Sequence, residues 1–172
     1  MQETINKYVS LFCSLHTNKQ KGMPAPHKAV LLLSVIDMIE AGFVRSNEIE
    51  LSERLEQCFK HNWDRYIGRS VIFAPKIGTP FFHLHSEPFW SLVPFVGGEE
   101  TIETLRKGNP YSTGTMRKHF RCAKIDRELF DLLKDEDVRA KLRTTLIASY
   151  IHPQKRMVDT IVPIIIAVLF AA

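Results

Sequence analysis

Apolar residues recur at three- and four-residue intervals near the start of this chain. Val9 and Phe12 follow this spacing, which predicts an amphipathic helix over residues 2–16. Residues 27–40 are almost wholly apolar and predict a central helix that is buried on all sides. Gly42 stands at the usual glycine position just past a helix end.

Strand and helix patterns mix in the rest of the chain. Residues 48–51 predict a short strand, and Ser52 precedes the next helical pattern at the position of a helix cap. Two apolar segments, 80–84 and 89–95, flank a Ser-Glu-Pro turn and predict the two arms of a β-hairpin. A basic loop is expected at 17–23 and a short helix or turn at 101–107, and further helices are expected after Asp126 and after Asp135 or Asp137.

Together these elements predict an α+β fold that is mainly helical, with a winged-helix-like core of helices, a short β-hairpin and C-terminal helices. One domain over residues 1–150 accommodates them, and an apolar C-terminal tail follows over 151–172. The last dozen residues, 161–172, are apolar but too few for a membrane-spanning helix, which needs roughly 20. We therefore expect a packed tail and no membrane partner, with membrane contact as the alternative.

Composition narrows the classes of function. The 23 basic residues exceed the 19 acidic ones by only four, so the net charge favours a polyanionic partner weakly. Three widely separated cysteines without a CxxC pair exclude a zinc knuckle of the usual spacing and fit a reducing, cytoplasmic location. The chain has no GxSxG, Walker A or GxGxxG motif, so we predict no catalytic residue and no cofactor.

His27 and Lys28 stand at the head of the apolar helix, where backbone N–H groups lack intrahelical partners and the helix dipole is positive. A phosphate at this end meets backbone donors, an imidazole and an ammonium together. The alternative is that Lys28 is merely solvated and that His27 caps the helix or packs.

The densest basic stretch lies at residues 116–124 and includes Arg117 and Lys118. Met116 and Phe120 interleave with the charges, so one side of the stretch is expected to be buried and the charges to be held in place. This pattern favours a track of phosphate contacts over a plain solvated face.

His83 and His85 form an HxH pair. If they lie on a strand, both imidazoles share one face and can act as metal ligands. A third ligand is not apparent, so we predict polar surface or phosphate contact rather than a metal site. A small metal-dependent hydrolase or nuclease that uses His83 and His85 remains the alternative function.

Three segments carry a resemblance to a known family: APHKAVLLLSVIDMIEAG, then LEQCFKHNW, then PFFHLHSEPFWSL. Over about residues 1–150 the chain resembles the sulfur-binding domain of modification-dependent HNH restriction endonucleases, which recognises phosphorothioate DNA. The resemblance implies that the basic pair His27 and Lys28 contacts the DNA backbone. It also implies a small apolar cup for sulfur, formed by an aromatic residue, a proline and then a small residue.

Pro80 matches the proline of the cup. Thr79 stands where the family has an aromatic residue, and His83 stands where it has a small one, which predicts a weaker preference for sulfur. The predicted DNA-binding residues are therefore His27, Lys28, Thr79, Pro80, His83, Arg117 and Lys118.

The HNH nuclease site needs several histidines and an asparagine, but after residue 150 only His152 is present and no Asn follows it. We therefore expect a DNA-recognition domain of a bacterial restriction system that does not cut DNA by itself. Its partners are DNA, with an ordinary or modified backbone, and an HNH nuclease, fused or separately encoded. A protein-interaction module with an apolar docking tail is a further alternative. The oligomeric state and the modification that is recognised are left open.

Overall fold

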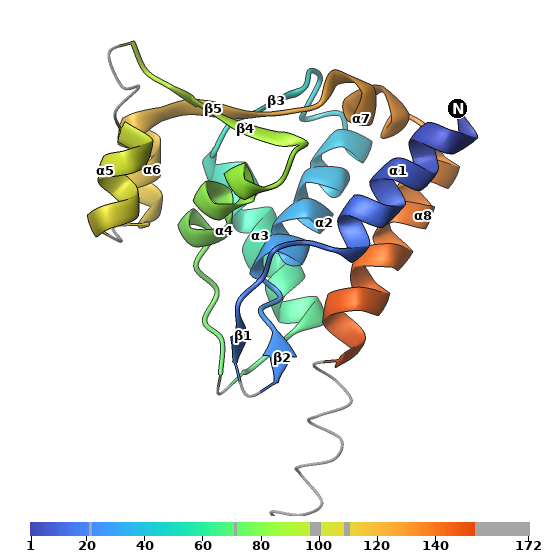
Figure 1. The fold of residues 1–172 in the computed structure, drawn as a ribbon, viewed down its shortest axis with the longest axis horizontal. Coiled ribbons are helices and arrows are strands. Elements are labelled where there is room, and N and C mark those ends of the chain that lie inside the picture. The colour runs from blue at the N-terminus through green and yellow to red at the C-terminus, as the bar shows by residue number, and fades with distance from the viewer. Residues whose placement is uncertain (21, 71, 97–100, 109–110, 154–172) are drawn as a thin grey trace, which may run out of the picture.

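The computed structural model describes residues 1–20, 22–70, 72–96, 101–108 and 111–153. These residues form an α+β fold that is mainly helical, which confirms the predicted class (Figure 1). The helices are α1 (Gln2–Cys13), α2 (His27–Glu40), α3 (Glu53–Tyr66), α4 (Gly78–His83), α5 (Thr101–Gly108), α6 (Thr113–His119), α7 (Arg127–Leu132) and α8 (Glu136–Leu146), with a 3-10 turn η1 (Leu84–Ser86) and a π-helical end η2 (Ile147–Ile151). The strands are β1 (Lys19–Gln20), β2 (Met23–Pro24), β3 (Glu48–Ile49), β4 (Trp90–Pro94) and β5 (Phe120–Ile125).

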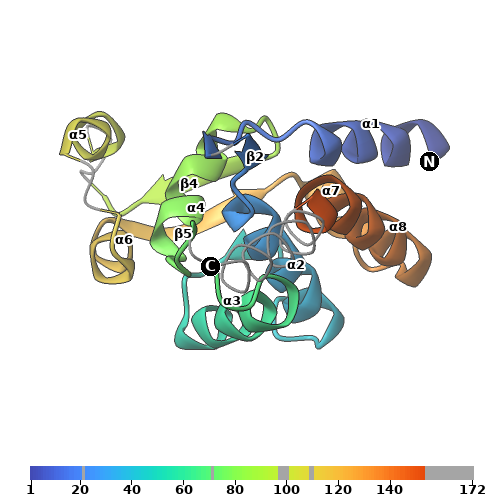
Figure 2. The same ribbon diagram turned by 90° about the horizontal axis from the view of Figure 1, so that it is seen from below.

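Helix α2 is the centre of the fold, as its uniformly apolar sequence predicts. Helices α3, α4 and α8 pack against it, and Figure 2 shows it enclosed between α1, α3 and α8. Pro26 precedes the helix, where its missing N–H costs no hydrogen bond. Gly42 follows its end with a φ of +74°, a left-handed conformation that favours glycine.

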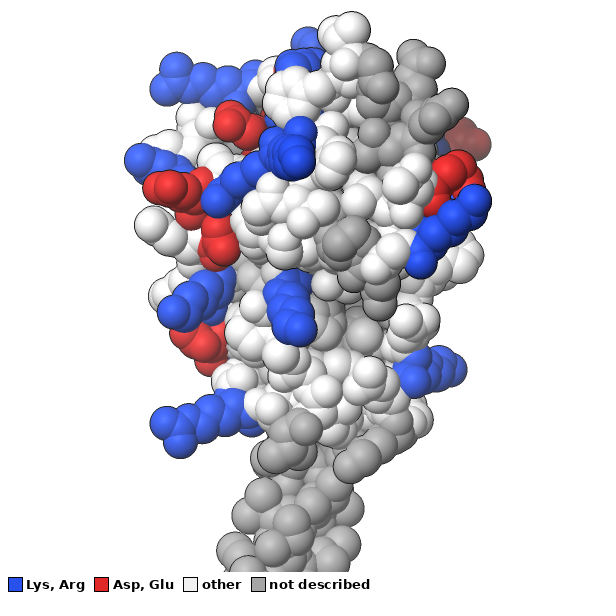
Figure 3. Space-filling view, turned by 90° about the vertical axis from the view of Figure 1, so that its left-hand side faces the viewer, with Lys and Arg blue, Asp and Glu red and all other residues white. Residues whose placement is uncertain are grey.

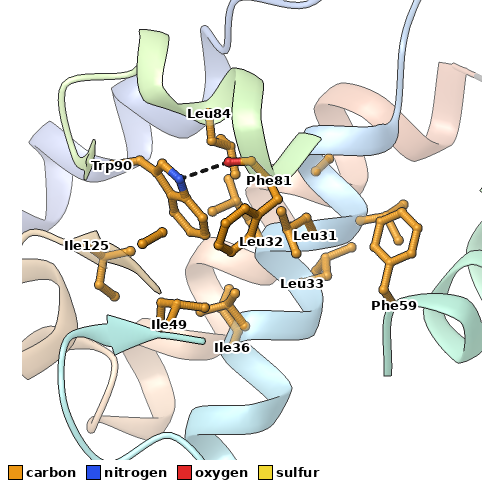
Figure 4. Close-up of a cluster of buried hydrophobic side chains, with 14 of the residues drawn as sticks. Leu31, Leu32, Leu33, Ile36, Ile49, Phe59, Phe81, Leu84, Trp90 and Ile125 are labelled. Atoms are coloured by element: carbon orange, nitrogen blue, oxygen red, sulfur yellow. Dashed lines mark hydrogen bonds between the residues drawn. The ribbon is translucent and has the colours of Figure 1, made fainter. Parts of the chain in front are cut away.

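The larger sheet is antiparallel with the order β3-β5-β4. Trp90 of β4 lies opposite Ile125 of β5, and both side chains join the core with Leu31 and Leu32 of α2 (Figure 4). The Trp90 indole N–H donates to the carbonyl oxygen of Phe81 at 3.2 Å. This bond satisfies the one polar group of a buried tryptophan and ties β4 to α4.

The hairpin predicted at 80–84 and 89–95 is wrong. The first segment is helical, in α4 and η1, and β4 pairs instead with β5, far along the chain. A short apolar run fits a buried helix and a buried strand equally well, and Pro80 is tolerated in a first helical turn. A short hairpin does form, between β1 and β2, in the segment predicted as a basic loop. The winged-helix arrangement stays a prediction.

Two of the predicted helix caps are present. The Ser52 hydroxyl accepts from the N–H of Leu55 at 3.2 Å, and the Asp135 carboxylate accepts two N–H groups at the start of α8. Asp126 precedes α7 as expected, but its carboxylate accepts from the Tyr8 hydroxyl at 2.9 Å rather than from the helix. No helix in the described ranges is long and apolar enough to cross a membrane. Residues 154–172 of the predicted tail lie outside the described residues.

Candidate nucleic-acid interface

A pocket of about 190 Å³ lies where the segment after α1, the first turn of α2 and helix α4 meet. These elements are distant in sequence and are brought together because α4 packs on α2. Five of the seven predicted DNA-binding residues line this pocket: His27, Lys28, Thr79, Pro80 and His83. Its other lining residues are His16, Thr17, Asn18, Ala25 and Ser86.

A close backbone approach holds helix α4 in place. A Cβ atom at Gly78 would lie only 2.2 Å from the carbonyl oxygen of Tyr111, so no larger residue fits there without a shift of the backbone. The Tyr111 ring stacks on Phe82 with 4.7 Å between centroids and meets the His83 ring edge-on at 4.6 Å. Aromatic pairs in such geometries are favourable, so the His83 ring is oriented from outside the pocket.

His27 is held by three neighbours. Its ring lies 4.8 Å from Trp63 and 5.7 Å from Phe73, between centroids, and its Nε2 is 2.8 Å from the carbonyl oxygen of Ala74. Because a carbonyl can only accept, Nε2 carries the proton and the neutral ring leaves Nδ1 as a lone-pair nitrogen. Burial lowers the pKa of His27, partly offset by the bond to Ala74.

Lys28 is buried, contrary to a solvated side chain, and its charge is paired. Its Nζ lies 2.6 Å from Glu87 Oε1 and 3.0 Å from Ser86 Oγ. Glu87 is itself buried and also accepts from the His16 backbone N–H at 2.9 Å. Burial lowers the pKa of Lys28, while Glu87 opposes that shift. The third N–H of the ammonium has no protein partner within the described ranges, which leaves one charged donor for a ligand.

His83 and His85 do not share a strand face, so this part of the metal hypothesis is wrong. His83 ends α4 and His85 lies in η1, and residues two apart on a helix do not face each other. The described residues contain no group of three or more His, Cys, Asp or Glu side chains that could hold a metal ion. Burial lowers the pKa of His83 first, followed by the nearby basic groups of His85, Lys28 and Arg106.

Arg117 and Lys118 lie elsewhere. Arg117 lines a separate groove of about 820 Å³ beside α6, where its guanidinium donates to the Leu51 carbonyl oxygen at 2.8 Å and to a Glu56 carboxylate oxygen at 2.9 Å. Lys118 is exposed and lines neither the pocket nor the groove. The acidic residues Glu50 and Glu53 share the groove, so it is not purely cationic.

The strand half of the basic stretch is also paired with acid. Arg121 donates to both carboxylate oxygens of Glu48, at 2.9 and 3.1 Å, and Lys124 lies 3.2 Å from the same group. These hydrogen bonds lower the pKa of Glu48 to about 2. On the side of the molecule formed by α5 and α6, Figure 3 shows basic side chains spread among uncharged ones, several of them beside acidic side chains. Phosphate contacts of residues 116–124 stay a prediction, and Arg117, Arg121 and Lys124 of this stretch are paired with Glu56 and Glu48.

Three residues of the pocket region were not predicted from the sequence: Glu87, Ser86 and His16. Glu87 lies in the Ser-Glu-Pro segment that was interpreted as a hairpin turn, and nothing local marks it as the partner of Lys28, which is 59 positions away. The only available signal was the buried lysine itself, since a lysine in an otherwise apolar helix requires a partner.

The pocket has the chemistry of an anion site with little fixed charge. Its single buried ammonium is paired with Glu87. Burial lowers the pKa of both His27 and His83, so their imidazoles add positive charge only where an entering anion favours their protonation. Pro80 and Ala25 supply apolar wall. No known protein family matches this chain, and a search of curated proteins finds no match either.

Proposed function

We propose that this chain is a DNA-recognition domain that binds the phosphate backbone and has no nuclease site of its own. The observation that carries the proposal is the convergence of His27, Lys28, Thr79, Pro80 and His83 on one pocket. The segments around His27 and around Pro80 also carry the resemblance to the sulfur-binding domain. Their meeting in one pocket is a feature of the fold and not of the sequence pattern, and it supports the proposal. DNA with a phosphorothioate backbone is the proposed preferred ligand.

The balance of charge in the pocket supports a weakly hydrated anion. A phosphate that enters loses water, and a buried ammonium already paired with Glu87 compensates that loss only in part. A phosphorothioate is softer and less hydrated than a phosphate, so its desolvation costs less. Contact with Pro80 and Ala25 then replaces water with apolar surface.

Two polar side chains temper this preference. Thr79 and His83 line the pocket, and they stand where the family that the sequence resembles has an aromatic and a small residue. A hydroxyl and an imidazole can hydrogen-bond the ordinary phosphate oxygen, which reduces the advantage of sulfur. The proposal is therefore a backbone binder with a modest sulfur preference.

A competition experiment tests the proposal. Phosphorothioate, methylated and plain duplexes of one sequence compete for the purified chain at several salt concentrations. We expect binding to all three at low salt, the tightest to phosphorothioate, with log K falling by about 0.9 per phosphate contact for each unit of log salt. The His27→Ala variant should bind more weakly than the wild type.

The matched control is His61→Ala, because His61 is exposed on α3 and lies outside the pocket lining. Absence of binding to every duplex at low salt would overturn the proposal. Equal loss in both histidine variants would remove the pocket from it. The metal-dependent hydrolase gains no support from the side-chain arrangement described above, and the docking-tail alternative concerns residues outside the described ranges.

A further inference from the structure

His85 has a fixed tautomer that makes it a hydrogen-bond acceptor toward α5. Its Nδ1 lies 2.6 Å from the carbonyl oxygen of Phe82, and since a carbonyl only accepts, Nδ1 carries the proton. The neutral ring therefore presents a lone pair at Nε2. The Nη2 group of Arg106 lies 3.2 Å from this Nε2 and donates to it. The backbone of α4 thus orients His85, and His85 orients the Arg106 guanidinium.

Arg106 retains donors for a ligand. Its side chain is 55% exposed, and its ion pair is with Glu103, one turn away on the same exposed helix, at 3.3 Å. Exposed ion pairs of this type contribute little to the stability of the fold, and a ligand phosphate can replace Glu103 as the partner of Arg106. A guanidinium has five N–H donors, and these contacts involve only two of its nitrogens. Arg117 has fewer donors to offer a ligand, because its guanidinium also donates to the Leu51 carbonyl oxygen and its side chain is less exposed, at 38%.

A series of side-chain contacts joins Arg106 to the pocket wall. His83 lines the pocket, and its ring lies 5.4 Å from that of Phe82, between centroids. The Phe82 ring lies 4.8 Å from that of His85, whose Nε2 is 3.2 Å from Arg106 Nη2. These contacts connect the Arg106 guanidinium to the pocket, and its charge also lowers the pKa of His83, after burial, His85 and Lys28.

We propose that Arg106, positioned by His85, binds the backbone phosphate next to the one held in the pocket, so that the DNA strand leaves the pocket over η1 toward α5. The inference rests on the proposed function and extends it. It replaces the basic stretch of α6 and β5 with α5 as the second backbone contact. Arginine suits this role because its planar fork binds phosphate through two parallel hydrogen bonds.

The neighbouring residue Lys107 offers a matched control. It lies on the same helix, is exposed, and has no ion pair in the part of the chain that the structure describes. Affinity for a phosphorothioate duplex is measured for the wild type, Arg106→Ala and Lys107→Ala over a range of salt concentrations. We expect Arg106→Ala to weaken binding about tenfold and to reduce the salt slope by about one, as for the loss of one phosphate contact. Lys107→Ala should change affinity by less than about threefold.

A double-mutant cycle tests the positioning role of His85. His85→Ala alone should weaken binding, and it should have no further effect in the Arg106→Ala background, because its contribution passes through Arg106. Additive effects of the two substitutions would show that His85 contacts DNA by itself and would overturn the positioning role.

The outcomes separate this inference from the proposed function. Suppose that the wild type binds DNA and that His27→Ala weakens this binding. Equal effects of Arg106→Ala and Lys107→Ala would then overturn the role of Arg106 but not the proposed function. Failure of the wild type to bind any duplex overturns both. Arg106→Lys gives a final discrimination, because it keeps the charge but loses the fork. Affinity between those of the wild type and Arg106→Ala, with the same sulfur preference in all three proteins, supports a second, ordinary phosphate as the ligand of Arg106, and a sulfur preference that changes with the substitution contradicts it.

Discussion

The pocket at the start of α2 and the groove beside α6 each hold a basic side chain bonded to a glutamate, but the two ion pairs have opposite surroundings. In the pocket, Lys28 and Glu87 have side chains that are 7% and 2% exposed. Arg117 lines the groove, and the side chains of Arg117 and its partner Glu56 are 38% and 43% exposed. The first pair is part of the core and sets the charge of a cavity, whereas the second is a surface contact that water screens. The position of a basic residue in a sequence therefore does not show whether its charge is free to bind a ligand, because that depends on the burial of its partner.

The largest expected effect comes from the same substitution made in both regions. Glu87→Gln leaves the Lys28 ammonium buried without its carboxylate, so the free energy of unfolding should fall by about 3 kcal/mol. Glu56→Gln removes an exposed partner of Arg117 and should cost less than about 1 kcal/mol. Urea unfolding of both variants measures the difference. Similar losses in the two variants would contradict the contrast in burial.

Two glycines extend the comparison to the backbone. Gly78→Ala places a methyl group 2.2 Å from the Tyr111 carbonyl oxygen, and the forced backbone shift should cost about 2 kcal/mol and loosen the pocket. Gly114→Ala on α6 meets nothing closer than the Ser112 hydroxyl at 4.0 Å, so it should be neutral or stabilise the protein by up to about 1 kcal/mol. Thermal unfolding measures both changes: the melting temperature should fall for Gly78→Ala and should stay the same or rise for Gly114→Ala.

The imidazoles make the stability of the pocket region dependent on pH. Burial lowers the pKa of His27 below its ordinary value of 6.5, so the unfolded chain binds the proton at a higher pH than the folded chain does. Stability should therefore fall as the pH decreases through 6.5 and should level off only below the pKa of folded His27. His27→Gln should flatten this dependence.

Urea midpoints measured between neutral and mildly acidic pH test the effect, with the exposed His61→Gln as control. DNA should act in the opposite direction, because a bound phosphate favours the protonated imidazole. A midpoint that falls equally with acid in the wild type and in His27→Gln would exclude His27 as the source.

The parts of the molecule that were predicted correctly have local causes. The three- and four-residue spacing of apolar residues predicts α1 and α3, and the side chains of Ser52 and Asp135 cap helices within three residues of their own positions. Helix α2 follows from its uniformly apolar composition. Each of these features depends on groups that are neighbours along the chain.

The errors concern contacts between distant segments. Residues 80–84 fit a strand as well as a helix, and the decision rests on packing of α4 against α2 and the Tyr111 backbone, neither of which is encoded locally. For the same reason, the residues next to Lys28 in the sequence did not predict its partner Glu87, which is 59 positions away. His27, Lys28 and His83 were named from their own sequence context, whereas Thr79 and Pro80 came from the resemblance, which stays a prediction. The same resemblance gave no indication that the charges of 116–124 are paired with Glu48 and Glu56.

The smallest expected effect belongs to Lys118, the one predicted DNA contact that is exposed and has no ion pair in the described ranges. Lys118→Ala should change the free energy of unfolding by less than about 0.5 kcal/mol, because an exposed side chain without contacts adds little to stability. It should weaken duplex binding by about twofold at low salt, equally for plain and phosphorothioate DNA, since a distant charge acts through a screened field. Affinity titrations at low and at physiological salt measure this loss, which should vanish at the higher concentration. A loss that persists at high salt would place Lys118 in direct contact with DNA and would make α6, rather than α5, the element that the strand follows out of the pocket.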